Sequence, residues 1–519
     1  MIDAPDGSAA RRTHQHEATT MRPTLRAISL VILLPGCGPK VVGILPGDPL
    51  GESETSAATS AVKLDIGGTG DSFTTDPLTT DDSGDTVKLD LGGAVDPRTV
   101  VQVSIHSVSA CALLSDGAVR CWGNSQHGEL GHGNQQQIGD DEHPASAGDV
   151  PLGAPATQIA VGASHACAIL EGGGVKCWGY GEEGALGYGN TENVGDDETP
   201  ADVGLVDIGE PALQITAGWR HNCVLLAGGR IRCWGGNIAG QLGYGHTNII
   251  GDDETPASAG DVSVGGEVVA VSAGEETTCV RLVDGGLRCW GDNFSGAIGL
   301  PGIKVAGDDE LPSSLPQVEV GGKVLDVAAG GFRTCVLLED GAVRCFGDNV
   351  YAALGTSAAP AICGDNNPCN IDPLCCIGDD ETPDSFPSVN VGDDVIALAG
   401  TGYGHCALLA SGGMRCWGNN RFGFMGRGTT PPGDICMECS LDPACCVGDD
   451  ETPASLGDIS LGGPVASIAA GQGMACAVLT TGAVRCWGYN TEGELGLGTT
   501  EVIGDDELPD AVPPLVIVE

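Results

Sequence analysis

Cysteines and clustered carboxylates are the residues of this chain that could do chemistry, and both recur along it at fixed intervals. The chain has 23 cysteines among its 519 residues. Cysteines form disulfides or bind soft metals such as zinc, whereas grouped carboxylates suit hard cations such as calcium. So many cysteines indicate an oxidising compartment, because cytosolic proteins rarely keep this number of thiols unless the thiols are spaced as metal ligands.

The stretch from Cys279 to Gly291, CVRLVDGGLRCWG, predicts a β-hairpin closed by a disulfide. Two β-favouring runs flank Val283, Asp284 and Gly285, so we expect a three-residue bulged loop with the glycine at positive φ. This hairpin places Cys279 opposite Cys289, and opposed residues have Cβ atoms about 4.5–5.5 Å apart, near the spacing of a disulfide. The motif occurs seven times and predicts the pairs Cys111–Cys121, Cys167–Cys177, Cys223–Cys233, Cys279–Cys289, Cys335–Cys345, Cys406–Cys416 and Cys476–Cys486.

The sequence Gly-Asp-Asp-Glu recurs in the long loop of every repeat and is a candidate cation site. Equivalent repeats would place 21 carboxylates in a ring on one face, at 139–142, 195–198, 251–254, 307–310, 378–381, 448–451 and 504–507. Two interpretations remain open. The carboxylates bind calcium or another cation, or the aspartate caps a turn and the following proline, as in Pro256, starts the next segment. We prefer the turn and expect no cofactor, with calcium as the alternative.

Two of the long loops carry cysteine-rich insertions. The Cys436-x-x-Cys439 spacing is compatible with zinc, but the other insertion has Cys363 and Cys369 in its place, so we predict disulfides within each insertion. Long asymmetric loops are the strongest candidates for contact with a partner. The predicted paired cysteines are Cys363, Cys369, Cys375 and Cys376 in one insertion and Cys436, Cys439, Cys445 and Cys446 in the other.

The remaining cysteine, Cys37, ends a stretch typical of a secretory signal. Two arginines precede an apolar run from Ala27 to Leu34, which is too short to span a membrane permanently. The stretch resembles a bacterial lipoprotein signal, which implies that Cys37 is lipidated and begins the mature protein. An ordinary secretory signal with an incidental Cys37 is the alternative.

The chain therefore divides into four predicted segments. Residues 1–20 are upstream sequence without fold content, 21–37 form the lipoprotein-type signal peptide, and 99–519 form the repeat domain. Residues 38–98 are rich in Ser, Thr, Asp and Gly and cannot bury enough apolar surface to fold, so they predict a disordered acidic tether. Two near-copies of VKLDIGG in the tether resemble a strand of the repeats, but we assign them to the tether.

The repeats predict an all-β fold, a seven-bladed β-propeller with four-stranded blades. The second cysteine of each hairpin recurs after 56 residues four times and then after 71 and 70 residues. Each copy contains four strand-like runs, and a radial arrangement of such units protects the sheet edges. A linear β-solenoid is the alternative, but its repeats are usually shorter. We expect residues 513–519 to dock beside the first repeat and close the ring.

Three further positions repeat within the hairpins. The glycine of each turn demands a positive φ. The aromatic residue after each second cysteine is predicted to pack in the core. The basic residue before each second cysteine, as in Arg288, is expected to be solvated or stacked on a ring. The aromatics are Trp122, Trp178, Trp234, Trp290, Phe346, Trp417 and Trp487.

The hairpin CxLxxDGxVxCWG is followed by Gly-x-Leu-Gly, as in GNSQHGELGHG at 123–133. Together these elements resemble the regulator of chromosome condensation repeat family, here in a bacterial secreted or lipoprotein form. The resemblance implies a seven-bladed propeller. The founding eukaryotic member is a nuclear exchange factor for a small GTPase, a role that a secretion signal and stapled strands contradict. A secreted bacterial relative inhibits β-lactamases through its propeller face, and no inhibitory loop of this chain matches it.

The net charge of −47 excludes nucleic acid as an expected partner and favours basic proteins and cations. We predict a monomeric, non-catalytic binding or adhesion scaffold of the cell envelope, lipid-anchored outside the cytoplasm, whose ligand is a protein or cell-surface molecule. An extracytoplasmic hydrolase or lyase in the propeller mouth is the first alternative, and a guanine nucleotide exchange factor the second. The sequence shows no catalytic residues by this reasoning: His165, His221 and His405 are expected to pack, and no acidic pair is recognised outside the sevenfold pattern.

Overall fold

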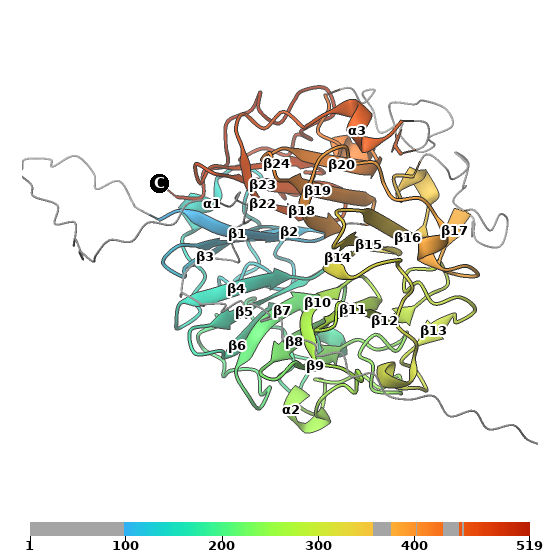
Figure 1. The fold of residues 1–519 in the computed structure, drawn as a ribbon. Coiled ribbons are helices and arrows are strands. Elements are labelled where there is room, and N and C mark those ends of the chain that lie inside the picture. Colours follow the sequence, from blue (N-terminus) through green and yellow to red (C-terminus); the bar gives the residue numbers. More distant parts are fainter. Residues whose placement is uncertain (1–97, 357–374, 401, 429–445, 449–450, 519) are drawn as a thin grey trace, which may run out of the picture. The chain divides into compact units, whose positions relative to one another are not determined.

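The computed structural model describes residues 98–356, 375–400, 402–428, 446–448 and 451–518. These residues form seven antiparallel sheets of three or four strands, one from each repeat. Figure 1 shows the sheets arranged around a common centre. The predicted seven-bladed, all-β propeller is confirmed. The predictions for residues 1–20, the signal peptide, Cys37 and nearly all of the tether lie outside the described residues.

Each blade uses consecutive strands. They are β1 (Val100–Ile105), β2 (Ser109–Leu114) and β3 (Val119–Gly123) in blade 1; β4 (Ala156–Val161), β5 (His165–Leu170) and β6 (Val175–Gly179) in blade 2; β7 (Ala212–Ala217), β8 (His221–Leu226) and β9 (Arg230–Gly235) in blade 3; β10 (Val268–Ala273), β11 (Thr277–Leu282), β12 (Leu287–Asp292) and β13 (Val305–Ala306) in blade 4; β14 (Val324–Ala329), β15 (Arg333–Leu338), β16 (Val343–Asp348) and β17 (Cys376–Ile377) in blade 5; β18 (Val395–Gly400), β19 (Gly404–Leu409), β20 (Met414–Asn419) and β21 (Cys446–Val447) in blade 6; and β22 (Val465–Ala470), β23 (Met474–Leu479) and β24 (Val484–Gly488) in blade 7.

Short helices interrupt the long loops. Those that follow the Gly-Asp-Asp-Glu segments start at a proline, whose fixed φ suits the first helical position. They are α1 (Pro144–Ala147), α2 (Pro256–Ala259), α3 (Pro453–Leu456) and the 3₁₀ turns Pro312–Ser314 and Pro383–Ser385, and three further 3₁₀ turns span Glu182–Gly184, Val350–Ala352 and Arg421–Gly423.

The stapled hairpin forms as the sequence predicts. Cys279 pairs with Cys289 across β11 and β12, and Gly285 closes the turn with φ +88°. The amide of Gly285 donates to the carbonyl of Leu282 at 2.9 Å, and the amide of Leu282 donates to the carbonyl of Gly286 at 2.9 Å. All seven hairpins carry the disulfide, with Cα–Cα separations of 4.0–4.1 Å.

The sequence of each repeat predicts its fourth strand after the long loop, as in QVEVGG at 317–322, and this position is wrong. The run at 317–322 is not a strand, and it reaches the sheet of blade 4 where Val318 N donates to Leu287 O at 2.9 Å. The other end of β12 pairs instead with β13, which lies just before the Gly-Asp-Asp-Glu segment. The outer edge of β12, a strand of six residues, is thus contacted at its two ends by two short stretches of loop.

The ring is closed. The first strands β1, β4, β7, β10, β14, β18 and β22 contact one another in this order, and β22 contacts β1. The C-terminal tail reinforces this junction, since Leu515 N donates to Val484 O of blade 7 at 2.9 Å and Ala145 N of blade 1 donates to Val516 O at 3.2 Å. Arg120 of blade 1 also donates to the carbonyl of Ile517. Figure 1 shows β22 beside β1, so the expectation for the C-terminal tail is confirmed for its described residues, 513–518.

The aromatic residues after the second cysteines join neighbouring blades. All seven are fully buried, which confirms their predicted packing role. The indole of Trp178 donates to Glu129 O of the preceding blade at 2.9 Å, and that of Trp122 donates to Glu494 O of blade 7 at 2.8 Å. The junction between blades 7 and 1 therefore uses the same contact as the junction between blades 1 and 2.

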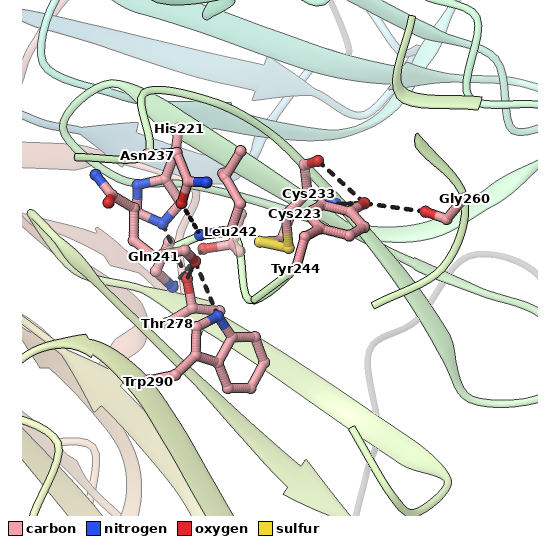
Figure 2. The surroundings of a disulfide bond; sticks show 12 residues. His221, Cys223, Cys233, Asn237, Gln241, Leu242, Tyr244, Gly260, Thr278 and Trp290 are labelled. Atoms are coloured by element: carbon pink, nitrogen blue, oxygen red, sulfur yellow. Dashed lines mark hydrogen bonds between the residues drawn. A yellow bond between two sulfur atoms is a disulfide. The ribbon is translucent and has the colours of Figure 1, made fainter. Parts of the chain in front are cut away.

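The carbonyl that receives the indole has a second donor in some blades. Gln241 O accepts from Trp290 Nε1 at 2.9 Å and from Thr278 Oγ1 at 2.8 Å, as Figure 2 shows beside the Cys223–Cys233 disulfide. Blade 5 has Phe346 in place of tryptophan, and there Thr334 Oγ1 alone donates to the equivalent carbonyl, Ala297 O, at 2.9 Å.

The prediction for the basic residues before the second cysteines is wrong. They are neither free in solvent nor stacked on a ring, but bind backbone carbonyls of the long loops. Arg232, for example, is buried and donates to Ile208 O at 2.6 Å and to Asp261 at 2.8 Å. Because charged donors form strong hydrogen bonds, these side chains hold the long loops against the blades.

Among the described residues, no helix has the length and apolar character needed to cross a membrane.

Candidate functional site

The blades differ most at one end of the ring, where the first strand of each blade turns into the second. We call this end the loop face. The residue four positions before each hairpin's first cysteine has six different identities in seven blades: Ser107, Ala163, Trp219, Glu275, Gly331, Gly402 and Gln472. Neighbouring loops are tied together, since Ala163 N donates to Trp219 O at 3.2 Å and Trp219 N donates to Glu275 O at 3.3 Å.

A cavity of about 230 Å³ lies at the centre of the loop face, where the ends of the first strands of all seven blades meet. Glu275 of blade 4 reaches into it and accepts a hydrogen bond from Gln472 Nε2 of blade 7 at 2.6 Å. Two glycines make room for this carboxylate, because a Cβ at Gly331 or Gly402 would lie 3.0 or 3.3 Å from its Oε1. Burial raises the pKa of Glu275, and the bond from Gln472 opposes that shift.

A second cavity, of about 500 Å³, lies beside the first between blades 3 and 4. Trp219 and Ile238 form its apolar part, with 38% and 81% of their surfaces exposed. Glu275 and Glu276 supply carboxylates to the same cavity. A pocket with an apolar wall and a few polar groups is the usual form of a ligand site, and we refer to this one as the Trp219 pocket.

Arg220 also lines the Trp219 pocket, but its charge is already matched. Its Nη1 lies 2.5 Å from Glu183 Oε1 of blade 2. Trp219 and Arg220 separate this pocket from a smaller cavity of about 260 Å³ toward blade 2. His127 and Tyr180 line that cavity with their rings 4.4 Å apart.

The Gly-Asp-Asp-Glu segments lie beyond the third strands, where their glycines pack against the preceding blade. A Cβ at Gly195, whose φ is +106°, would lie 2.3 Å from Gly128 O, and Gly195 O accepts from Asn134 N at 3.1 Å. These contacts and the helix-starting prolines give the segment the role of a structural turn.

The three acids of each segment also fit a cation. In Asp196, Asp197 and Glu198, and in at least four other copies, one oxygen from each residue lies within 4.8 Å of the others. Burial and a hydrogen bond with Asp197 raise the pKa of Glu198 to about 7. The shielded Oε2 of Glu142 has no hydrogen-bond partner among the described residues. Such a cluster is suited to share a proton or to hold a hard cation.

The histidines that precede hairpin cysteines are buried between blades. His165 Nε2 lies 3.0 Å from Asn222 Oδ1, and His221 Nε2 lies 3.0 Å from Thr278 Oγ1. Burial lowers the pKa of His165 to about 4 and those of His221 and His405 to about 3. These rings are neutral packing elements at ordinary pH.

The cysteine-rich insertions lie mostly outside the described residues. Cys375, Cys376 and Cys446 are disulfide-bonded, and Cys376 and Cys446 belong to the short strands β17 and β21. The pairing predicted for Cys363, Cys369, Cys436, Cys439 and Cys445 stays a prediction, as does lipidation of Cys37.

Comparison with known proteins identifies the repeat. Models of the regulator of chromosome condensation (RCC1) repeat match residues 100–129, 156–185, 213–241, 268–297, 324–352 and 465–494, and also 116–169 and 173–225. The chain belongs to the RCC1 repeat family. The RCC1-repeat domain is similar to the ultraviolet-B receptor UVR8 of Arabidopsis thaliana, with 27% identity over 407 residues that cover 78% of this chain and 80% of the receptor.

One further relative matches this chain over a small part of its own sequence, and two solved structures share its fold. The E3 ubiquitin-protein ligase HERC2 of Homo sapiens is 27% identical over 381 residues, which are 72% of this chain but only 7% of the ligase. Yeast RCC1 (Prp20), solved bound to Kap60, superposes with a TM-score of 0.57 at 17% identity, covering 80% of this chain and 84% of the yeast protein. Human WBSCR16 superposes with a TM-score of 0.53 at 17% identity, covering 74% of this chain and 91% of the human protein. These structures show the same fold.

Sequence reasoning missed the central residues of the loop face. Glu275 and Glu276 are an acidic pair that occurs in one repeat only, so the statement that no such pair exists outside the sevenfold pattern was wrong. Trp219 is likewise the one tryptophan outside the hairpin position. An alignment of the seven repeats that looks for the most variable column would have found both.

Proposed function

We propose that this RCC1-repeat propeller is a non-catalytic scaffold that binds a protein or cell-surface ligand through its loop face. The observation that carries the proposal is the contrast within the repeats. Disulfides, buried aromatics and loop-binding basic residues are nearly the same in every blade, whereas the loop-face residues differ.

The loop face also has the composition of an interface. Exposed aromatic side chains are enriched where proteins meet, and Trp219, Phe294 and Phe332 are 38%, 59% and 40% exposed in three successive blades. Yeast Prp20, which shares the fold, was solved with Kap60 and is described together with its binding properties to Gsp1p and histones. Protein binding by a propeller of this type therefore supports the same general role here.

We further propose that the scaffold is a monomer held at the cell envelope by a lipid on Cys37. The signal-like stretch before Cys37 supports this placement, and the acidic charge argues against a nucleic-acid partner. The cysteine-rich insertions are proposed as an additional contact region, because they are the largest departures from the repeat.

A comparative pull-down from envelope extracts tests the scaffold. The bait is the chain from residue 38 onward, which omits Cys37 and with it the proposed lipid. We expect a partner that the wild-type bait enriches and that a loop-face variant, Trp219→Ala with Ile238→Ser and Phe332→Ser, does not.

The matched control changes exposed apolar residues at the other end of the first strands. Leu213→Ser and Leu325→Ser alter side chains that are 64% and 52% exposed near the starts of β7 and β14. Loss of the partner with this control, and retention with the loop-face variant, would assign binding to the opposite end and contradict the proposal.

An enzyme in the propeller mouth is the second candidate, and the observation that favours it is the Glu275 and Glu276 pair. A buried carboxyl with a raised pKa beside a second carboxylate is a pattern found in hydrolase sites. Glu275→Gln retains the shape of the side chain and can still bond with Gln472. Hydrolysis of a glycan or peptide library by the wild type that this variant abolishes would establish the enzyme and overturn the scaffold.

A further inference from the structure

The Trp219 pocket has features that select one kind of occupant. It combines an exposed indole ring, the aliphatic side chains of Ile238 and Ile249, and the carboxylates of Glu275 and Glu276. A cation beside an aromatic face is stabilised by the ring quadrupole, and carboxylates add direct charge attraction. An apolar or anionic occupant would instead bury those carboxylates without a counter-charge.

The charges that line the pocket leave it negative. Its walls contain Glu183, Glu275, Glu276 and Arg220. The three carboxylates and one guanidinium give a formal charge of −2, and the guanidinium is already paired with Glu183 at 2.5 Å. The two remaining carboxylates belong to neighbouring positions of one loop.

The chain itself places cations on other aromatic rings of the loop face. Lys304 Nζ lies 5.7 Å from the ring centre of Phe294, and the guanidinium carbon of Arg421 lies 4.6 Å from that of Phe422. Among the described residues, no lysine or arginine is placed over Trp219 in this way. The most electron-rich exposed ring of this face thus remains available to a cation from outside.

We propose that the Trp219 pocket takes a lysine or arginine side chain of the partner, with its aliphatic part against Ile238 and Ile249 and its charge facing Trp219 and Glu276. This inference rests on the proposed function and names the chemistry of the partner. The chain's charge of −47 supports it, because a strongly acidic protein attracts basic partners and speeds their encounter.

Short peptides of matched shape test the pocket directly in the chain from residue 38 onward. The probes are Ac-Leu-Arg-Leu-NH2, Ac-Leu-Lys-Leu-NH2 and Ac-Leu-citrulline-Leu-NH2, and citrulline is the neutral counterpart of arginine. Binding is measured by calorimetry and by tryptophan fluorescence. A change in fluorescence on binding reports on Trp219, because the other six tryptophans are fully buried and out of reach of a peptide.

We expect the arginine and lysine peptides to bind at least tenfold more tightly than the citrulline peptide, and more weakly as salt is added. Trp219→Ala and Glu276→Gln should each weaken the arginine peptide by about fivefold or more, whereas Trp219→Phe should retain part of the affinity. Phe294→Ala is the matched control, since it removes an exposed aromatic of the same face outside the pocket and should leave binding unchanged. Circular dichroism of each variant verifies its fold.

Equal binding of the arginine and citrulline peptides, or unchanged binding in Trp219→Ala, overturns the inference. If a pull-down partner still depends on the loop face in that case, the scaffold stands and only the nature of its contact is wrong. If neither the peptides nor a partner bind, the proposed function fails as well.

Discussion

The hydrogen bonds that the indoles of Trp178 and Trp290 donate to the preceding blades yield a prediction that compares two otherwise similar substitutions. Trp178 and Trp290 are both fully buried, and each donates to a carbonyl at 2.9 Å. Glu129 O, the acceptor for Trp178, has this one donor among the described residues. Gln241 O, the acceptor for Trp290, also receives Thr278 Oγ1 at 2.8 Å.

Replacing either tryptophan by phenylalanine removes the indole N–H donor and leaves a cavity of similar size. In Trp178→Phe the carbonyl of Glu129 becomes buried and unpaired, which costs about 1–3 kcal/mol. In Trp290→Phe the carbonyl of Gln241 keeps its bond from Thr278, so the loss falls to about 0.5–1.5 kcal/mol. We therefore expect Trp178→Phe to be the more destabilising by about 1 kcal/mol, and the natural Phe346, which lies beside Thr334, follows the same rule.

Urea unfolding of the disulfide-intact protein, followed by circular dichroism, measures the difference. Thr278→Val in the Trp290→Phe background removes the second donor to Gln241 O and should raise the loss of unfolding free energy to that of Trp178→Phe. Thr278→Val alone is the control for the contact that Thr278 also makes with His221. Equal destabilisation by the two phenylalanine substitutions would refute the reasoning. So would full additivity of Thr278→Val and Trp290→Phe, because the two donors share one acceptor.

Further predictions concern the C-terminal tail, the acids of the Gly-Asp-Asp-Glu segments and the cysteine-rich insertions. Deleting residues 513–519 removes the buried Leu515 and Ile517 and the acceptor of Arg120, so the melting temperature should fall sharply; unchanged melting would contradict the observed closure. Glu198, Glu381 and Glu507 have pKa values raised to about 7, 8 and 7, chiefly by burial. Between pH 4.5 and these values the folded state therefore binds more protons than the unfolded state, so these groups should make stability fall as the pH rises from about 4.5 to 8 in denaturant titrations, with little further change above pH 8. Calcium added at pH 8.5 should restore stability if the acids hold a cation and should change neither stability nor heat in calorimetry if they form only a turn. Deleting the insertion at 363–374, together with Cys375→Ala and Cys376→Ala so that no unpaired thiol remains, should leave the melting temperature of the ring within a few degrees and remove partner binding; a retained partner would exclude the insertion as a contact.

The sequence predicted the features that repeat locally. The hairpin register, the positive φ of its glycine and the burial of the aromatics follow from residues within one repeat, where spacing alone fixes the geometry. Ring closure followed from matching the C-terminal run to the corresponding segment of the other copies.

The features that the sequence did not predict depend on contacts between distant segments. The fourth strand was misplaced because the long loop meets β12 at two separate points, which strand propensity does not reveal. The basic residues were misassigned because the carbonyl that binds Arg232, Ile208 O, comes from a loop more than 20 residues away. The Trp219 pocket combines loops of three blades, so its residues are ordinary surface residues in any one repeat.

The closing contacts have a consequence for how the chain could be connected. Trp122 meets Glu494 at the terminal junction in the same way as Trp178 meets Glu129 within the chain, so the ring has no structurally distinct first blade. A circularly permuted version, with residues 98 and 518 joined by a short linker and new ends opened in a hairpin turn such as Asp340-Gly341, should assemble the same seven junctions. The order of blades in the chain would change, while the arrangement of side chains around the loop face would not.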